Sequence, residues 1–123
     1  MNRIDTTANR IKFALKVRDK KQIDLVKSTG LDKGSISYYC SGKYEPKQDA
    51  IYKMAKVLDV SEMWLWGYDC PMERPIEQKE NDELVDLVER LKKDKGFRSL
   101  VIKLDKLNPE QLDGLMKLMN IQM

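Results

Sequence analysis

Residues 22–41 read QIDLVKSTGLDKGSISYYCS, a stretch that contains two short helical patterns separated by a glycine. Gly30 interrupts the first pattern where the chain must turn, and glycine reaches a left-handed backbone without the steric penalty of a Cβ atom. Asp32 can then cap a second helix by accepting hydrogen bonds from its first backbone N–H groups. Two short helices joined by such a turn are typical of a helix-turn-helix.

The second helix of this pair has two chemically different sides. Ile36, Tyr39 and Cys40 recur at helical spacing and form the side that we expect to be buried. The other side carries small or hydrogen-bonding groups with one lysine, namely Lys33, Gly34, Ser37, Tyr38 and Ser41. Such a face can enter a DNA major groove closely and read the edges of the bases. An ordinary solvated helix is the alternative, although such a helix usually mixes Glu with Lys.

Several motifs of the first half agree in order and spacing with one known family. The matching positions are Gln22, Leu25, Gly30 and Ile36, followed by SGKYEP at residues 41–46. These resemble the helix-turn-helix of temperate-phage repressors and xenobiotic-response-element-like regulators. RIKFAL at residues 10–15 and VLDVSEMWLWGYD at residues 57–69 are similar to the first and last helices of that domain. The resemblance covers residues 5–70 and implies an all-α, five-helix, lambda-repressor-like DNA-binding domain.

Two kinds of contact with DNA are expected from this domain. We expect Lys33 to contact a base, with guanine as the first choice and a phosphate as the alternative. The resemblance implies that Gln22 braces Lys33, and that the loop after the recognition helix contacts phosphates, which fixes register without reading sequence. The predicted DNA-binding residues are Lys21, Gln22, Lys33, Gly34, Ser35, Ser37, Tyr38, Ser41, Lys43 and Tyr44.

Charge divides the chain into a basic half and a nearly neutral half. Residues 1–58 contain 13 Lys and Arg against 6 Asp and Glu, a net charge of +7, whereas residues 71–123 contain 10 against 11. Positive potential over the half that carries the helix-turn-helix is what phosphate binding requires. A solvated basic face is the alternative explanation.

Residue types argue against several classes of function. The chain contains no histidine, the usual general base and the commonest metal ligand. Cys40 and Cys70 do not form a CxxC pair, so we predict neither a disulfide framework nor a zinc site. No apolar run approaches 18 residues, and no secretory leader opens the chain. We therefore predict a cytoplasmic protein that is not an enzyme, with no catalytic residues, no metal and no cofactor.

Three further helices complete the predicted DNA-binding domain at residues 1–70. The first begins at Asp5 or Thr6 and ends near Arg18. Its expected buried stripe is Ala8, Ile11, Ala14 and Leu15, and its other faces carry Arg10, Lys12, Lys16 and Arg18. Another helix spans about residues 48–58. Ser61 caps the last, where Trp64 and Trp66 supply one core anchor and one partly exposed ring.

Residues 71–80, a polar run with two prolines, are predicted to be a linker, and residues 81–123 a helical oligomerisation segment. Asn81 and Asn108 are expected to cap helices there, and KKDKG at residues 92–96 to interrupt the pattern. Three short helices hold too little core to be stable alone. We predict self-association through Leu84, Leu87, Val88, Leu91, Phe97, Leu100, Val101, Leu104, Leu112, Leu115, Met116 and Met119. Packing of these stripes on the first domain is the alternative.

The leading interpretation is a sequence-specific transcriptional repressor of the phage type, with a role in lysogeny. It would bind a palindromic operator in double-stranded DNA as a homodimer or higher oligomer, with helix 33–41 in the major groove. Residues 71–123 are too few for the self-cleaving peptidase-like domain of longer relatives, so we expect release to depend on an antirepressor protein. The alternative is an antitoxin-like or other interaction module whose tail binds a protein partner. We expect no membrane partner.

Overall fold

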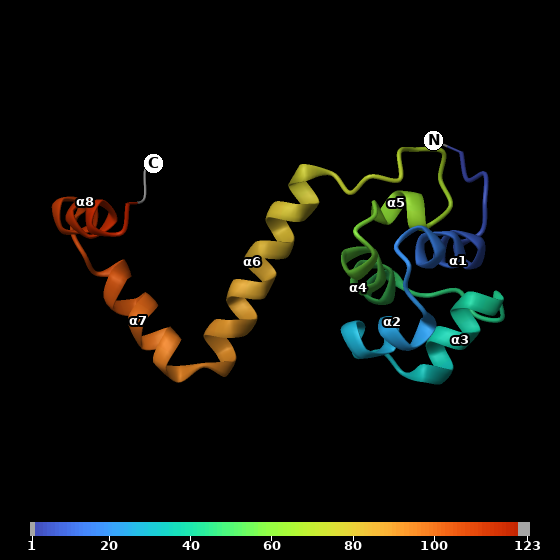
Figure 1. The fold of residues 1–123 in the computed structure, drawn as a ribbon, viewed down its shortest axis with the longest axis horizontal. Helices are drawn as coiled ribbons and strands as arrows, with labels where there is room; N and C mark the ends of the chain where they lie inside the picture. The colour runs from blue at the N-terminus through green and yellow to red at the C-terminus, as the bar shows by residue number, and fades with distance from the viewer. Residues whose placement is uncertain (1, 121–123) are drawn as a thin grey trace. The chain divides into compact units, whose positions relative to one another are not determined.

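The computed structural model describes residues 2–120, which contain eight helices and no strand beyond two isolated antiparallel bridges. The helices are α1 (Thr7–Val17), α2 (Gln22–Thr29), α3 (Lys33–Ser41), α4 (Gln48–Leu58), α5 (Glu62–Leu65), α6 (Ile76–Lys93), α7 (Lys95–Asp105) and α8 (Pro109–Leu118). They belong to two compact units, the first running to Asp82 and the second beginning at Glu83 (Figure 1). The prediction of an all-α chain with a five-helix N-terminal domain is confirmed.

The helix-turn-helix forms as the local signals predict. Gly30 ends α2 with a φ of 74°, in the left-handed region that favours glycine. The Asp32 side chain caps α3 by accepting a hydrogen bond of 3.2 Å from the backbone N–H of Ser35. Gly42 ends α3 with a φ of 82°. α3 therefore has its predicted bounds, residues 33–41.

The core of the first unit is made by the apolar stripes of α1–α5. α3 packs against α1 and α2, while α4 packs against α2 and α5. The fully buried side chains that join these helices include Ile11, Leu25, Ile36, Ile51, Met54, Leu58 and Leu65. Trp64 is buried and Trp66 only partly so, which confirms the predicted division between the two tryptophans. Because all five helices contribute to one cluster, α3 is held with its polar side outward.

α1 differs from its predicted pattern at Arg10. The predicted stripe does not include this side chain, but it is buried, whereas Ala8 of the stripe is only half-buried. The Arg10 guanidinium pairs with the Asp5 carboxylate at 3.1 Å and lies 4.7 Å from the centre of the Trp64 ring. An arginine can be buried when a carboxylate and an aromatic face replace the water that would otherwise surround its guanidinium group. Helical periodicity alone does not contain that information.

The predicted linker is wrong in its second half. α6 begins at Ile76, so residues 76–80 are helical and Asn81 lies inside a helix instead of capping one. Pro75 precedes the first turn, where a proline costs nothing because that N–H has no helical partner. Arg74 is 2% exposed and explains why this segment folds on the first unit. Its guanidinium makes bonds of 2.8 and 2.7 Å to the two carboxylate oxygens of Asp82.

The same guanidinium reaches the domain core. Arg74 Nη1 donates to the backbone carbonyl of Val60 at 3.0 Å, and the bridge between Val60 and Glu73 lies beside it. The hydrogen bonds from Arg74 to the Asp82 carboxylate hold the pKa of that carboxyl below its usual value of 3.8. We call this pairing of Arg74 with Asp82 the Arg74 clasp. It joins the first turns of α6 to the helix-turn-helix unit.

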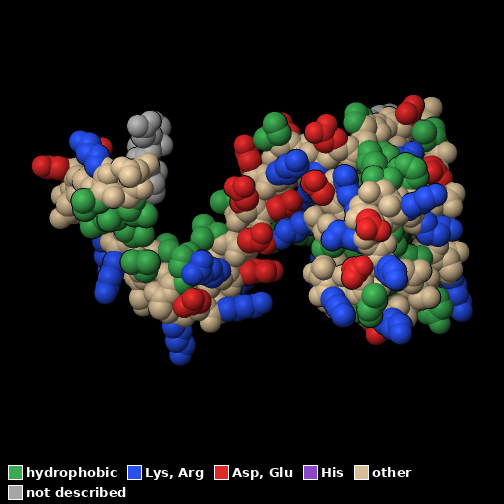
Figure 2. Space-filling view, in the orientation of Figure 1, with side chains coloured by type: hydrophobic (Ala, Val, Ile, Leu, Met, Phe, Trp, Pro, Cys, Tyr) green, Lys and Arg blue, Asp and Glu red, His purple; other side chains and the backbone are tan. Residues whose placement is uncertain are grey.

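The second unit contains the rest of α6 with α7 and α8. Asp94 caps α7, and Asn108 caps α8 in a capping box with Gln111, as predicted for Asn108. None of the described residues of α6, α7 and α8 is buried. Figure 2 shows apolar side chains open on the surface of α7 and α8. The second unit therefore has well-formed helices without a core of its own.

Candidate nucleic-acid interface

The outward side of α3 is the first part of the candidate interface. Lys33, Gly34 and Ser37 are exposed, and Tyr38 is 39% exposed, as the helical phase predicted. Ser35 is half-buried, and its backbone N–H is used by the Asp32 cap. Residues 33–37 at the start of α3 thus offer one ammonium group, serine hydroxyls and bare backbone at Gly34. This combination can approach base edges without a bulky side chain between them.

Gly34 has a structural role in addition to any role at DNA. A Cβ atom at this position would meet Asp32 Oδ2 at 3.0 Å. That oxygen is the one that caps the helix, so a larger residue would press on the cap. The glycine therefore protects the start of α3, which is a reason that the sequence pattern did not contain.

Residues at the end of α3 form a compact group, which we call the α3 C-terminal cluster: Tyr38, Ser41, Lys43 and Tyr44. The rings of Tyr38 and Tyr44 meet edge to face with centroids 5.0 Å apart. Lys43 Nζ lies 4.6 Å from the centre of the Tyr38 ring. Ser41 Oγ and the backbone N–H of Lys43 both donate to the Tyr38 carbonyl, at 3.1 and 3.0 Å. The structure thus brings together four residues predicted to contact DNA.

This cluster holds its cation in place. A lysine over an aromatic face is attracted by the negative face of the ring, which restricts an otherwise mobile side chain. The same two rings carry the Tyr38 and Tyr44 hydroxyls, which can hydrogen-bond. A positive charge with neighbouring hydroxyls suits a phosphate oxygen better than a base edge.

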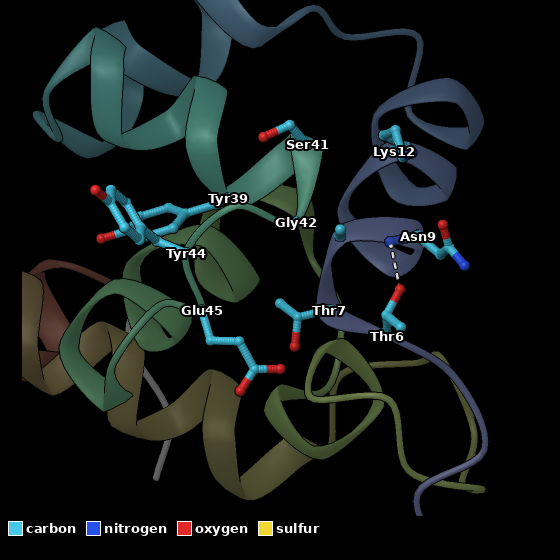
Figure 3. A pocket seen from close by; sticks show the side chains of 10 residues that line it. Thr6, Thr7, Asn9, Lys12, Tyr39, Ser41, Gly42, Tyr44 and Glu45 are labelled. Carbon is cyan, nitrogen blue, oxygen red and sulfur yellow. Dashed lines mark hydrogen bonds between the residues drawn. The ribbon is translucent and has the colours of Figure 1, made fainter.

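A groove of about 320 Å³ continues from this cluster to the start of α1 (Figure 3). Its walls come from the first turns of α1 on one side and from the end of α3 with its loop on the other. Asn9 and Lys12 of α1 line it together with Ser41 and Tyr44. Sequence reasoning missed Asn9 and Lys12, because nothing local shows that α1 begins beside the loop after α3. For Lys12, helical spacing predicts only a position outside the buried stripe of α1.

The carboxylate of Glu45, in the loop after α3, is paired with an arginine. Glu45 accepts a hydrogen bond of 2.6 Å from Arg3 Nη2, and Arg3 Nη2 also lies 3.5 Å from the Thr7 hydroxyl. The N-terminal segment that carries Arg3 is held in turn, since the backbone N–H of Ile4 donates to the Gly67 carbonyl at 2.8 Å. The pairing offsets the negative charge of Glu45 beside the groove.

The start of α2 is the remaining predicted contact region. Lys21 and Gln22 are exposed there, as expected. The Asp24 carboxylate accepts a hydrogen bond of 2.8 Å from the Lys21 backbone N–H, so an acidic side chain already occupies this helix start. The bracing of Lys33 by Gln22 stays a prediction.

The described residues also bear on metal and thiol chemistry. Within residues 2–120 no three His, Cys, Asp or Glu side chains are grouped so that they could hold a metal ion. Burial raises the pKa of the Cys40 thiol, which keeps it neutral inside the core. No helix in that part of the chain is long and apolar enough to cross a membrane.

Comparison with known families agrees with the geometry. Residues 11–65 match the sequence model of a helix-turn-helix family of the xenobiotic-response-element type, which covers a little under half of the chain. No curated protein matches the chain. The matched residues run from within α1 to the end of α5 and include the whole of α3. The match indicates a DNA-binding transcription regulator, in a family that is typically not enzymatic.

Proposed function

We propose that this protein is a sequence-specific transcriptional repressor of the phage type, which places α3 in the DNA major groove. The observation that carries the proposal is the outward side of α3, which is polar, slender and continuous with the α3 C-terminal cluster. The family match at residues 11–65 and the basic first half support it.

The two ends of α3 make different kinds of contact with DNA. Lys33 and Ser37, with the bare backbone at Gly34, read base edges near the start of the helix. Lys43, Ser41 and the two tyrosine hydroxyls of the cluster bind phosphates at its end. Asn9 and Lys12 extend the phosphate contact along the groove to α1. Sequence preference therefore comes from the first turns of α3, and most of the sequence-independent affinity comes from the cluster.

Self-association through the second unit would pair two such domains on a palindromic operator. Its support is the exposed apolar side chains of α6–α8 and the residue that follows, which include Leu84, Leu87, Val88, Leu100, Leu112 and Met119. Apolar surface on capped helices is stabilised when a partner covers it. Two-fold pairing of the protein matches two-fold symmetry in the DNA site. An antirepressor stays a prediction from the sequence.

The alternative, an antitoxin-like module, differs in what the second unit binds. Its tail would stay unfolded until a partner protein arrived. The Asp94 and Asn108 caps favour helices that form without such a partner. We therefore keep the repressor as the proposed function.

The first experiment selects duplexes from a random pool with the full chain and follows the affinity of the winner against salt. A palindromic winner is expected, with a log–log salt slope of several units, because each neutralised phosphate releases counterions. Lys33→Ala should cost about 1–3 kcal/mol at one base position and relax the preference there. Lys43→Ala should weaken all duplexes alike and lower the salt slope by about one unit.

Lys27→Ala is the matched control, since it removes the same charge from an exposed position in the last turn of α2, outside the predicted interface. It should change neither the preference nor the slope by a comparable amount. Enrichment of no sequence, with weak binding that all three lysine variants reduce equally, would show that the fold serves as a scaffold for a protein partner.

A further inference from the structure

α6 separates its charges along its length. Between Glu77 and Glu89 it carries six acidic residues and one lysine, and from residue 90 onward it carries Arg90, Lys92 and Lys93. Figure 2 shows acidic side chains along the upper part of this helix and basic ones near its lower end. A helix with its basic groups in the last turn is favourable to its own dipole. Of the acidic residues before them, Glu77 in the first turn also suits the dipole, and Asp82 belongs to the Arg74 clasp.

The apolar stripe of the same helix lies across the point where the charge changes sign. Leu84, Leu87, Val88 and Leu91 recur at helical spacing, and the first three are 61%, 42% and 47% exposed. Glu83 and Arg90 are both exposed and stand seven residues apart, about two turns. They therefore lie along the same edge of the stripe. Glu83 is in the acidic part of α6, and Arg90 is in its basic part.

We propose that α6 pairs with α6 of a second copy of this chain in antiparallel orientation, with Glu83 of each copy facing the partner's Arg90. In an antiparallel pair, equivalent edges of the two stripes face each other and run in opposite directions. The acidic half of each helix then lies against the basic end of the other. In a parallel pair, the edge with Glu83 and Arg90 would face the other edge of the partner's stripe, which carries Asn81 and Val88. The acidic halves of the two helices would then lie side by side.

A contact within the second unit prepares Arg90 for this role. Its guanidinium lies 4.0 Å from the centre of the Phe97 ring, at the start of α7. A guanidinium stacked on a ring keeps its N–H groups directed sideways, where a carboxylate can accept two of them. The stripe supplies the apolar contact, and the two symmetric ion pairs set the orientation.

The antiparallel pairing rests on the self-association proposed above, and the test distinguishes failure of the pairing from failure of self-association. Glu83→Lys and Arg90→Glu variants of the full chain are studied singly and mixed, by sedimentation velocity over a concentration series. Each variant alone should dimerise about tenfold more weakly, because two exposed ion pairs become two repulsive contacts. The mixture should recover the dimer, since Lys at position 83 then faces Glu at position 90 of the other variant, while Arg90 faces Glu83.

Glu89→Lys is the control, because it changes the same charge on the side of α6 away from the stripe, and it should leave the dimer nearly unchanged. Helical content from circular dichroism shows that each variant is folded. A dimer that neither variant weakens, or a mixture that recovers nothing, overturns the antiparallel pairing and leaves self-association through another surface. A wild-type chain that stays monomeric at every concentration overturns the proposed self-association and the pairing together.

Discussion

The two units of this protein are built from similar amphipathic helices but treat their apolar faces in opposite ways. In the first unit, 14 apolar side chains are buried in one cluster, and all of them except Val60 belong to α1–α5. In the second unit, α7 and α8 bury none of their described residues, although a side chain caps the start of each helix. Helical pattern and capping are thus not enough to make a core. What the second unit lacks is a helix of its own placed across its stripes.

This difference assigns different physical roles to the two apolar surfaces. Burial in the first unit offsets the conformational entropy of folding and holds α3 in place. The apolar surface of the second unit is available for association, where it contributes only when a partner covers it. Changes to the two surfaces should therefore be seen in different measurements, stability for one and assembly for the other.

The largest expected effect comes from truncating one leucine in each unit. Leu58→Ala should lower the free energy of unfolding by about 2–5 kcal/mol, because it leaves a cavity in a fully buried site. Leu100→Ala, at a position 55% exposed, should cost less than about 0.5 kcal/mol in dilute solution. Urea denaturation followed by circular dichroism measures both. Equal losses would mean that the second unit has a core of its own.

The Arg74 clasp should give the next largest effect. Asp82→Asn removes the charge that neutralises a buried guanidinium, which should cost about 1–3 kcal/mol. Because the folded-state pKa of Asp82 is lowered, the clasp contributes fully above the usual value of 3.8 and is lost as the pH falls through the folded-state pKa. The stability difference between wild type and Asp82→Asn, measured by thermal unfolding, should therefore shrink in acid. A difference that grows as the pH falls would contradict the clasp.

The smallest effect compares the caps of the two units. Asp32→Ala should cost the first unit about 1 kcal/mol, since α3 loses the acceptor for its first turn. Asn108→Ala removes an equivalent cap from α8, but it should reduce helical content and assembly without shifting the main unfolding transition. Calorimetry with circular dichroism separates these readouts. One transition shifted equally by both changes would show that the units unfold together.

Local signals explain how much of the molecule could be predicted. α3 was predicted residue by residue, because Asp32, Gly30 and Gly42 act on the backbone next to them. Arg10 and Arg74 were not, because each is buried by partners that only the fold supplies. Pro75 was interpreted as a linker residue, although a proline before a helix is equally consistent with a helix start.

The candidate interface divides in the same way. Its α3 residues follow from helical phase, and the loop residues from family resemblance. Asn9 and Lys12 could not be found, because the groove joins two segments, residues 6–12 and 39–45, that are far apart in sequence. The arrangement of Lys43 over the tyrosines also depends on the fold of the loop, since the sequence shows only that these residues are close neighbours.

The most direct test of the account measures the mass and affinity of the complex on the selected duplex and on one with a single half-site scrambled. Sedimentation equilibrium with labelled DNA gives both quantities. If the first unit reads DNA and the second unit pairs two copies, the intact duplex should carry two chains, and scrambling one half-site should weaken binding by at least tenfold. One chain per duplex, with equal affinity for both duplexes, would contradict the claim that the first unit reads DNA and the second unit pairs two copies.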